Sequence, residues 1–240
     1  MENLKLAEKY KNILDNFSKS LKDIYQDDLV SLMLYGSAAS GEFVARHSNL
    51  NVIAVLKNTD LEILKKSSKV ICKYRMINVL FLTKEHISTS IDVFPIEFLD
   101  MQDNYFVMQG EDILKDIHVD LRNLRFQCEQ ELKGKLLKIK QMYLVSCENE
   151  GALKKLLFLS FISILHILRN ALRLKGKKPS YLKQDVIRDI SSEFQINNEA
   201  WQKILQAKNN QVKLNKQDTE KLFINFTRDL EKIVNIMDKL

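Results

Sequence analysis

The segment LMLYGSAASGEFVARHSNLNVIAVL, residues 32–56, combines the residue types best suited to chemistry. Gly36 and Ser37 follow a nearly continuous apolar run, and Asn49 and Asn51 introduce a second such run. Runs of this kind are typical of strands that are covered on both faces, where residues i and i+2 point to the same side. Two carboxylates with that spacing can share magnesium ions, but here both side chains are amides.

The same segment resembles the signature of the nucleotidyltransferase superfamily related to DNA polymerase beta. In that family a Gly-Ser turn after the first strand cradles a triphosphate. A loop then leads to Ser-Asp-x-Asp at the head of the second strand, where two aspartates hold divalent metal. The resemblance aligns Gly36, Ser37 and Ser48 with nucleotide-binding positions, and Arg46 lies in the loop that would approach the triphosphate. It implies a nucleoside triphosphate as ligand.

Asn49 and Asn51 stand where the family has its two metal-binding aspartates. Asparagine offers a neutral carbonyl oxygen, which attracts a hard magnesium ion far more weakly than a carboxylate does. Two-metal nucleotidyl transfer needs concentrated negative charge, because one ion activates the attacking oxygen and the other neutralises the leaving pyrophosphate. The resemblance therefore implies a degenerate metal site that binds Mg²⁺ weakly.

A third carboxylate, on a neighbouring strand, completes the metal cage in this superfamily. Residues 94–101, FPIEFLDM, resemble that strand, and Glu97 is the best match, with Asp100 next. In the aminoglycoside-modifying branch a glutamate on that strand is the general base for the substrate hydroxyl, a role that Glu97 could keep. Glu97 is thus the expected catalytic residue and, beside Asn49 and Asn51, the third expected metal ligand.

Two functions follow from these residues, and they leave open whether the protein is an enzyme. The first is a degenerate nucleotidyltransferase that works as a nucleotide-binding or regulatory protein. The second is an active transferase that moves a nucleoside monophosphate to a small hydroxylated molecule or a protein side chain, with Glu97 as base. Nucleic-acid binding through the basic residues of 173–183 is weaker, because only Tyr181 interleaves with the positive charges.

Apolar periodicity predicts the elements that would position these residues. An amphipathic helix is expected over residues 4–25, and Asp60 and Thr83 are expected to cap two further helices. Strands are expected at residues 29–35, 50–56, 77–82 and 94–101. Pro95 would suit the first residue of the last strand, because proline cannot donate to a ladder.

After Gly110 the pattern changes to long helical periods. Helices are expected over residues 120–147, 152–174 and 180–194, around Trp201, and over residues 222–240. The fold class expected is α+β, with a small nucleotidyltransferase-type mixed sheet and flanking helices over residues 1–115. An antiparallel helical bundle is expected over residues 116–240. This order is also the plan of the kanamycin nucleotidyltransferase branch that the chain resembles.

Composition narrows the class of protein further. Six glycines and two prolines in 240 residues exclude collagen-like and linker architectures, and the net charge of +6 is spread among interspersed acids. Cys72, Cys128 and Cys147 are too few for a disulfide framework, and the longest apolar run is too short to span a bilayer. A cytoplasmic protein is expected, with a nucleotide as partner, without membrane or nucleic acid, and with a homodimer as a compatible assembly.

Overall fold

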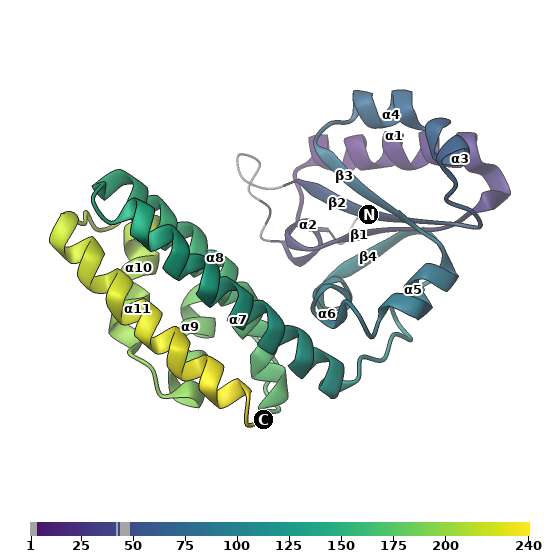
Figure 1. The fold of residues 1–240 in the computed structure, drawn as a ribbon. Coiled ribbons are helices and arrows are strands. Elements are labelled where there is room, and N and C mark those ends of the chain that lie inside the picture. Colours follow the sequence, from purple (N-terminus) through teal and green to yellow (C-terminus); the bar gives the residue numbers. More distant parts are fainter. Residues whose placement is uncertain (1–3, 42, 44–48) are drawn as a thin grey trace. The chain divides into compact units, whose positions relative to one another are not determined.

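The structure, a computed structural model, describes residues 4–41, 43 and 49–240. Contacts divide the chain into two compact units, Met1–Val119 and Asp120–Leu240. The first unit contains a sheet with helices on both faces, and the second consists of helices (Figure 1). The chain is therefore an α+β protein with a helical C-terminal half.

The first unit is built on a mixed sheet of four described strands in the order β3-β2-β1-β4. The strands are β1 (Leu29–Tyr35), β2 (Leu50–Leu56), β3 (Ile77–Leu82) and β4 (Tyr105–Gly110). Strand β1 pairs antiparallel with both β2 and β4, whereas β3 runs parallel to β2. The carboxyl end of β1 therefore meets the amino ends of the other three strands at one end of the sheet, called below the Gly36 end.

Helices cover both faces of this sheet (Figure 1). On one face α1 (Glu8–Tyr25), α3 (Leu61–Lys65) and α4 (Ser68–Lys73) enclose a core that includes Phe17, Leu34 and Val52. On the other face α5 (Lys84–Ser90) and α6 (Pro95–Asp103) pack over Met33 and Ile53. Because both faces are buried, β1 and β2 read as continuous apolar runs. A short turn of helix, η1 (Gln26–Asp28), joins α1 to β1.

The strand predicted at residues 94–101 is wrong, because this segment forms helix α6. Phe94, Ile96 and Phe98 alternate with other residues and imitate the period of a strand. In the structure Pro95, Phe98 and Met101 are buried at a spacing of three, which is the period of a helix face. Pro95 stands in the first turn, where its missing N–H costs nothing. The fourth strand is β4, which follows directly.

The second unit contains five described helices, four of which begin at an Asp or Asn whose side chain caps the helix. They are α7 (Leu121–Ser146), α8 (Glu150–Leu174), α9 (Lys183–Phe194), α10 (Asn198–Lys208) and α11 (Lys216–Met237). Asp120 accepts a hydrogen bond from the backbone N–H of Arg122, which confirms the predicted cap. Phe161, Trp201 and Phe226 form an aromatic cluster with ring centroids 5.1 to 6.2 Å apart. All three rings are buried and form part of the core of the second unit.

Among the described helices, one, α8, is long and apolar enough to cross a membrane when judged by length and composition alone. Twelve of its residues, among them Leu157, Ile164 and Leu168, are buried in the protein. The central helix of a water-soluble bundle has the same composition, so α8 is weak evidence for a membrane segment.

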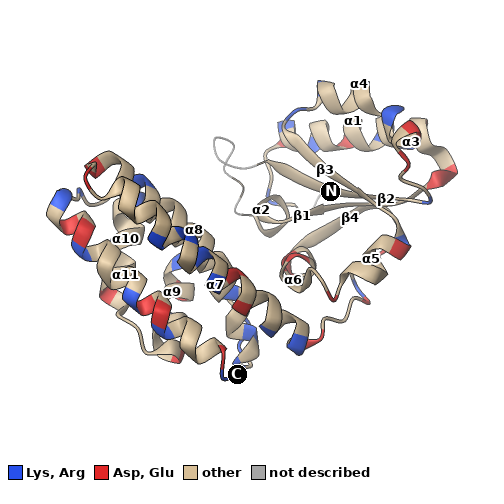
Figure 2. Cartoon of the chain, in the orientation of Figure 1, with Lys and Arg blue, Asp and Glu red and all other residues tan. Residues whose placement is uncertain are grey.

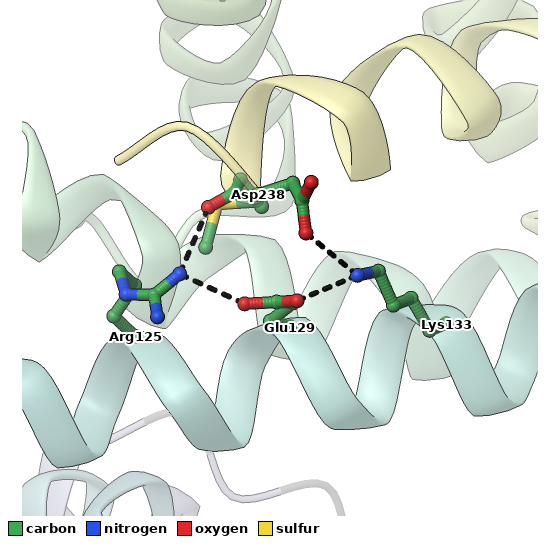
Figure 3. A network of polar contacts seen from close by, with 5 residues as sticks. Arg125, Glu129, Lys133 and Asp238 are labelled. Atoms are coloured by element: carbon green, nitrogen blue, oxygen red, sulfur yellow. Dashed lines mark hydrogen bonds and ion pairs between the residues drawn. The ribbon is translucent and has the colours of Figure 1, made fainter.

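A network of charged side chains ties the end of α11 to the first half of α7 (Figure 3). The Glu129 carboxylate accepts from Arg125 at 2.8 Å and from Lys133 at 2.6 Å. Lys133 also contacts Asp238 at 2.7 Å, and Arg125 donates to the backbone carbonyl of Met237 at 3.4 Å. The hydrogen bond from Lys133 lowers the pKa of the Asp238 carboxyl below its ordinary 3.8. The ionised form of Asp238 is therefore favoured in the folded protein.

Because of this lowered pKa, the free energy of unfolding of the second unit should depend on pH in the acidic range. A carboxyl with a lowered folded-state pKa stabilises the fold above its unfolded pKa, and the stabilisation disappears as the pH falls through the folded value. We expect Asp238→Asn to lower the thermal midpoint near neutral pH and to equal the wild type well below pH 4. Thermal unfolding followed by circular dichroism across this range measures the gap. A gap that stays constant with pH would contradict the assigned role of Asp238.

Gly110, at the end of β4, cannot accept a side chain. Its φ is +81°, and a Cβ there would lie 2.1 Å from the carbonyl oxygen of Val30. We expect Gly110→Ala to destabilise the first unit by more than about 2 kcal/mol, because both the dihedral strain and the overlap with backbone must be relieved. Gly134→Ala is the matched control, since nothing lies within 4 Å of its Cβ position in α7. It should stabilise by about 0.5–1 kcal/mol in urea unfolding.

Candidate functional site

The candidate site begins at the turn that follows β1. Gly36 has a φ of +75°, a region that L-residues rarely occupy, and its N–H donates to the carbonyl of Asn104 at 3.0 Å. The Gly36 carbonyl accepts from the N–H groups of Ala39 and Ser40, both at 3.0 Å, so the chain turns at once into α2 (Ser37–Ser40). Ser37, predicted to bind nucleotide, is the half-buried first residue of that short helix.

Asn51 and Asn78 lie side by side on neighbouring strands at this end of the sheet. They are partners in the parallel register of β2 and β3, and the Nδ2 of Asn78 donates to the Oδ1 of Asn51 at 3.5 Å. At this length the hydrogen bond between the two amides is weak. Asn51 is half-buried and Asn78 is exposed. Asn49 is exposed as well and precedes β2 directly.

The Asn51 side chain also faces the Gly36 turn. Its Oδ1 is directed to Asn78, and its Nδ2 would lie 3.5 Å from a Cβ placed on Gly36. The absence of a side chain at Gly36 therefore leaves the amide N–H₂ group of Asn51 open to the space beside the turn.

One row of uncharged polar side chains crosses the whole sheet at the Gly36 end. Tyr35 is the register partner of both Tyr105 and Asn51, and Asn51 is the partner of Asn78. Directly paired residues point to the same face of a sheet. Tyr105, Tyr35, Asn51 and Asn78 thus form a row in the strand order β4-β1-β2-β3, called below the neutral row. Its face is the one that carries Met33 and Ile53.

The two tyrosines of the neutral row stay protonated at neutral pH. Burial raises the pKa of Tyr35. Burial, together with a 3.1 Å hydrogen bond to Asp112, raises the pKa of Tyr105 to about 12. Both hydroxyls are therefore neutral groups that can donate or accept a hydrogen bond.

A magnesium ion does not fit the donors that the described residues offer at the Gly36 end. None of the four described strands contains Asp, Glu, Lys or Arg, and Figure 2 shows them without charged residues. Among the described residues no group of three His, Cys, Asp or Glu could hold a metal ion. Magnesium is held in proteins by carboxylates, and amide oxygens alone supply little of the attraction. The expected metal ligands Asn49 and Asn51 are present, but they form a neutral site.

Glu97 was expected on a strand beside Asn51, and this premise is wrong. Glu97 is an exposed residue in the first turn of α6, and the strand position adjacent to Asn51 belongs to Asn78. The role of Glu97 as base and metal ligand stays a prediction. The predicted nucleotide-binding residues Arg46 and Ser48 lie outside the described residues.

Asn78 is the residue that sequence reasoning missed, although the sequence contains a signal for it. Asn51 is the second residue of LNVIAVL and Asn78 is the second residue of INVLFL. Two strands with the same amino-terminal pattern, one polar residue followed by an apolar run, predict paired polar residues if the strands are parallel and in register.

Comparison with known proteins supports the fold. No protein-family model matches the sequence, and no curated protein matches it either. Among solved structures, the chain is similar to the spectinomycin adenyltransferase AAD(9) from Enterococcus faecialis, whose structure contains ATP and spectinomycin. The TM-score is 0.59 at 11% sequence identity, over 92% of this chain and 99% of that chain. The chain therefore has the nucleotidyltransferase fold, with helices in its C-terminal half.

The neutrality of Asn51 and Asn78 can be tested by restoring charge. In Asn51→Asp with Asn78→Asp, two carboxylates about 4 Å apart should destabilise the first unit by roughly 1–4 kcal/mol without metal. Mg²⁺ or Mn²⁺ should recover the thermal midpoint in this variant and leave the wild type unchanged, because only paired carboxylates attract the ion. Asn12→Asp with Asn16→Asp, two exposed positions on α1, is the matched control and should show no metal effect. Metal stabilisation of the wild type would contradict a neutral site.

Proposed function

We propose that this protein is a degenerate nucleotidyltransferase that binds a nucleoside triphosphate at the Gly36 end and works as a nucleotide-binding or regulatory protein. The observation that supports this most is the pairing of Asn78 with Asn51 on adjacent strands. With Asn49 it gives three amides at the Gly36 end, where the fold's metal-dependent members need carboxylates. In this proposal the protein keeps the fold and lacks the carboxylates that metal-dependent transfer needs.

The loss of charge acts on catalysis more than on binding. Nucleotidyl transfer needs metal ions to stabilise charge that develops only in the transition state, whereas a turn of backbone can hold phosphate oxygens in the ground state. Removing the carboxylates therefore lowers the rate of transfer far more than the affinity for nucleotide. ATP is the first ligand to test, since the similar adenyltransferase was solved with ATP.

The remaining partners follow from the same proposal. Cys72, Cys128 and Cys147 are free thiols, as a cytoplasmic location requires. In the basic segment between α8 and α9, Lys177 forms an ion pair with Glu193 at 3.2 Å, which reduces the charge open to nucleic acid. Figure 2 shows acids and bases on the same helices of the second unit. We propose a nucleotide as ligand, no role for nucleic acid, and a monomer or homodimer.

An experiment with two readouts tests the function. Calorimetric titration of ATP, GTP, CTP and UTP, with Mg²⁺ or Mn²⁺ and with EDTA, measures binding, and release of pyrophosphate in the presence of hydroxylated acceptors measures transfer. We expect binding of at least one nucleotide and no transfer above background. Transfer at about 1 s⁻¹ or faster, the range of ordinary enzymes, would reject the proposal. Absence of binding for every nucleotide would reject it as well.

An active transferase with Glu97 as base remains the second candidate. It is favoured by one connection: Asn104, the residue directly after α6, accepts the hydrogen bond from Gly36, so the helix that carries Glu97 is joined to the turn. If pyrophosphate release is detected, Glu97→Gln should reduce it by about 100-fold or more, as expected for loss of a general base. Glu62→Gln, an exposed glutamate in the first turn of α3, is the control and should leave the rate unchanged.

A further inference from the structure

We infer that the Gly36 end binds the triphosphate as a metal-free anion, with the amides of Asn51 and Asn78 in place of magnesium. This inference rests on the proposed nucleotide binding and adds its mode. It reverses the usual dependence on metal, because magnesium should compete with this protein for the nucleotide instead of assisting it.

The polarity of the neutral row supports this mode. A carboxylate repels phosphate oxygens unless a cation lies between them, whereas an amide N–H₂ group can donate to them directly. The Nδ2 of Asn51 faces the space beside Gly36 that a side chain would occupy at any other residue type, since a Cβ on Gly36 would lie 3.5 Å from it. The Asn51 and Asn78 amides have four N–H bonds in total, and one of them is used among the described residues, in the 3.5 Å bond from Asn78 to Asn51.

The hydroxyl group of Tyr35 in the same row fits an anion rather than a cation, whereas the hydroxyl of Tyr105 already donates to Asp112. Tyr35 lies directly beside Asn51 in the register, and its raised pKa keeps the hydroxyl protonated. A protonated phenol can donate to a phosphate oxygen but adds no negative charge for a metal. Across β1, β2 and β3 the row therefore presents donors and no anions.

The charge of the ligand decides the sign of the metal effect. The free triphosphate carries more negative charge than its magnesium complex, and hydrogen bonds strengthen with the charge of the acceptor. A carboxylate site gains affinity when magnesium is added, because the ion bridges two anions. A site of neutral amide and hydroxyl donors gains nothing from the ion and loses part of its attraction.

Calorimetric titration of ATP and of inorganic triphosphate tests the inference. In EDTA we expect both ligands to bind, which places recognition on the phosphates. With magnesium in excess over ligand, we expect affinity for ATP to fall by about threefold or more. Binding that requires magnesium, or equal affinity in both conditions, would overturn the inference and leave the proposed nucleotide binding intact. Absence of ATP binding in both conditions would overturn both.

Variants of Asn51 test whether the triphosphate binds at the neutral row. Asn51→Asp should weaken ATP binding in EDTA by about tenfold or more, the effect of replacing a donor to a charged group by a like charge. Magnesium should then strengthen binding, so the sign of the metal effect reverses. Asn16→Asp, exposed on the helix that covers the opposite face, adds the same charge and should change neither measurement.

Folding of each variant is checked by its thermal midpoint, which separates loss of binding from loss of structure. Asn51→Ser keeps a small neutral side chain and removes the amide. It should weaken binding in EDTA without acquiring a magnesium requirement. If Asn51→Asp and Asn51→Ser both fold and bind ATP in EDTA as tightly as the wild type, the anion does not contact Asn51 and the inference is wrong.

Discussion

The parallel pairing of β3 with β2 is the constraint on which the site depends. Because β1 is antiparallel to β2, the turn at Gly36 already lies beside the start of β2, but these two strands give only one amide side chain within the sheet. The parallel register adds Asn78 next to Asn51. A shift of β3 by one residue would send Asn78 to the opposite face, into the core with Phe17. The apolar residues of β3 fix the register and thereby fix the site.

An asparagine has nearly the shape of an aspartate, so the two can occupy one place in a fold while differing in charge. In this protein amides occupy two paired positions, and the four described strands contain no Asp, Glu, Lys or Arg. A lone amide could be a local change around one functional carboxylate. Amides at both Asn51 and Asn78 alter the electrostatic character of the site completely, and this is why binding and catalysis separate in the proposed function.

The sequence predicted the parts of the fold whose signals are local. The apolar runs of β1 to β3 and the polar cap at Asp120 depend on neighbours in the chain, and the structure confirms them. Residues 94–101 were misread because alternating Phe94, Ile96 and Phe98 satisfy the period of a strand, and only the tertiary packing of α6 decides for a helix. Asn78 was missed because its partner lies 27 residues away, and pairing at that range depends on strand direction.

The uncharged sheet has a consequence for the folding of the chain itself. Strand β3 lies at an edge, and its sequence INVLFL has high β-propensity, no charge and no proline, the features of segments that pair with other chains when exposed. Leu80 is 39% exposed even in the folded unit. Arg75 and Lys84 flank the strand and supply the repulsion that its own residues lack. Protection against self-association thus falls to the two residues that bracket the strand.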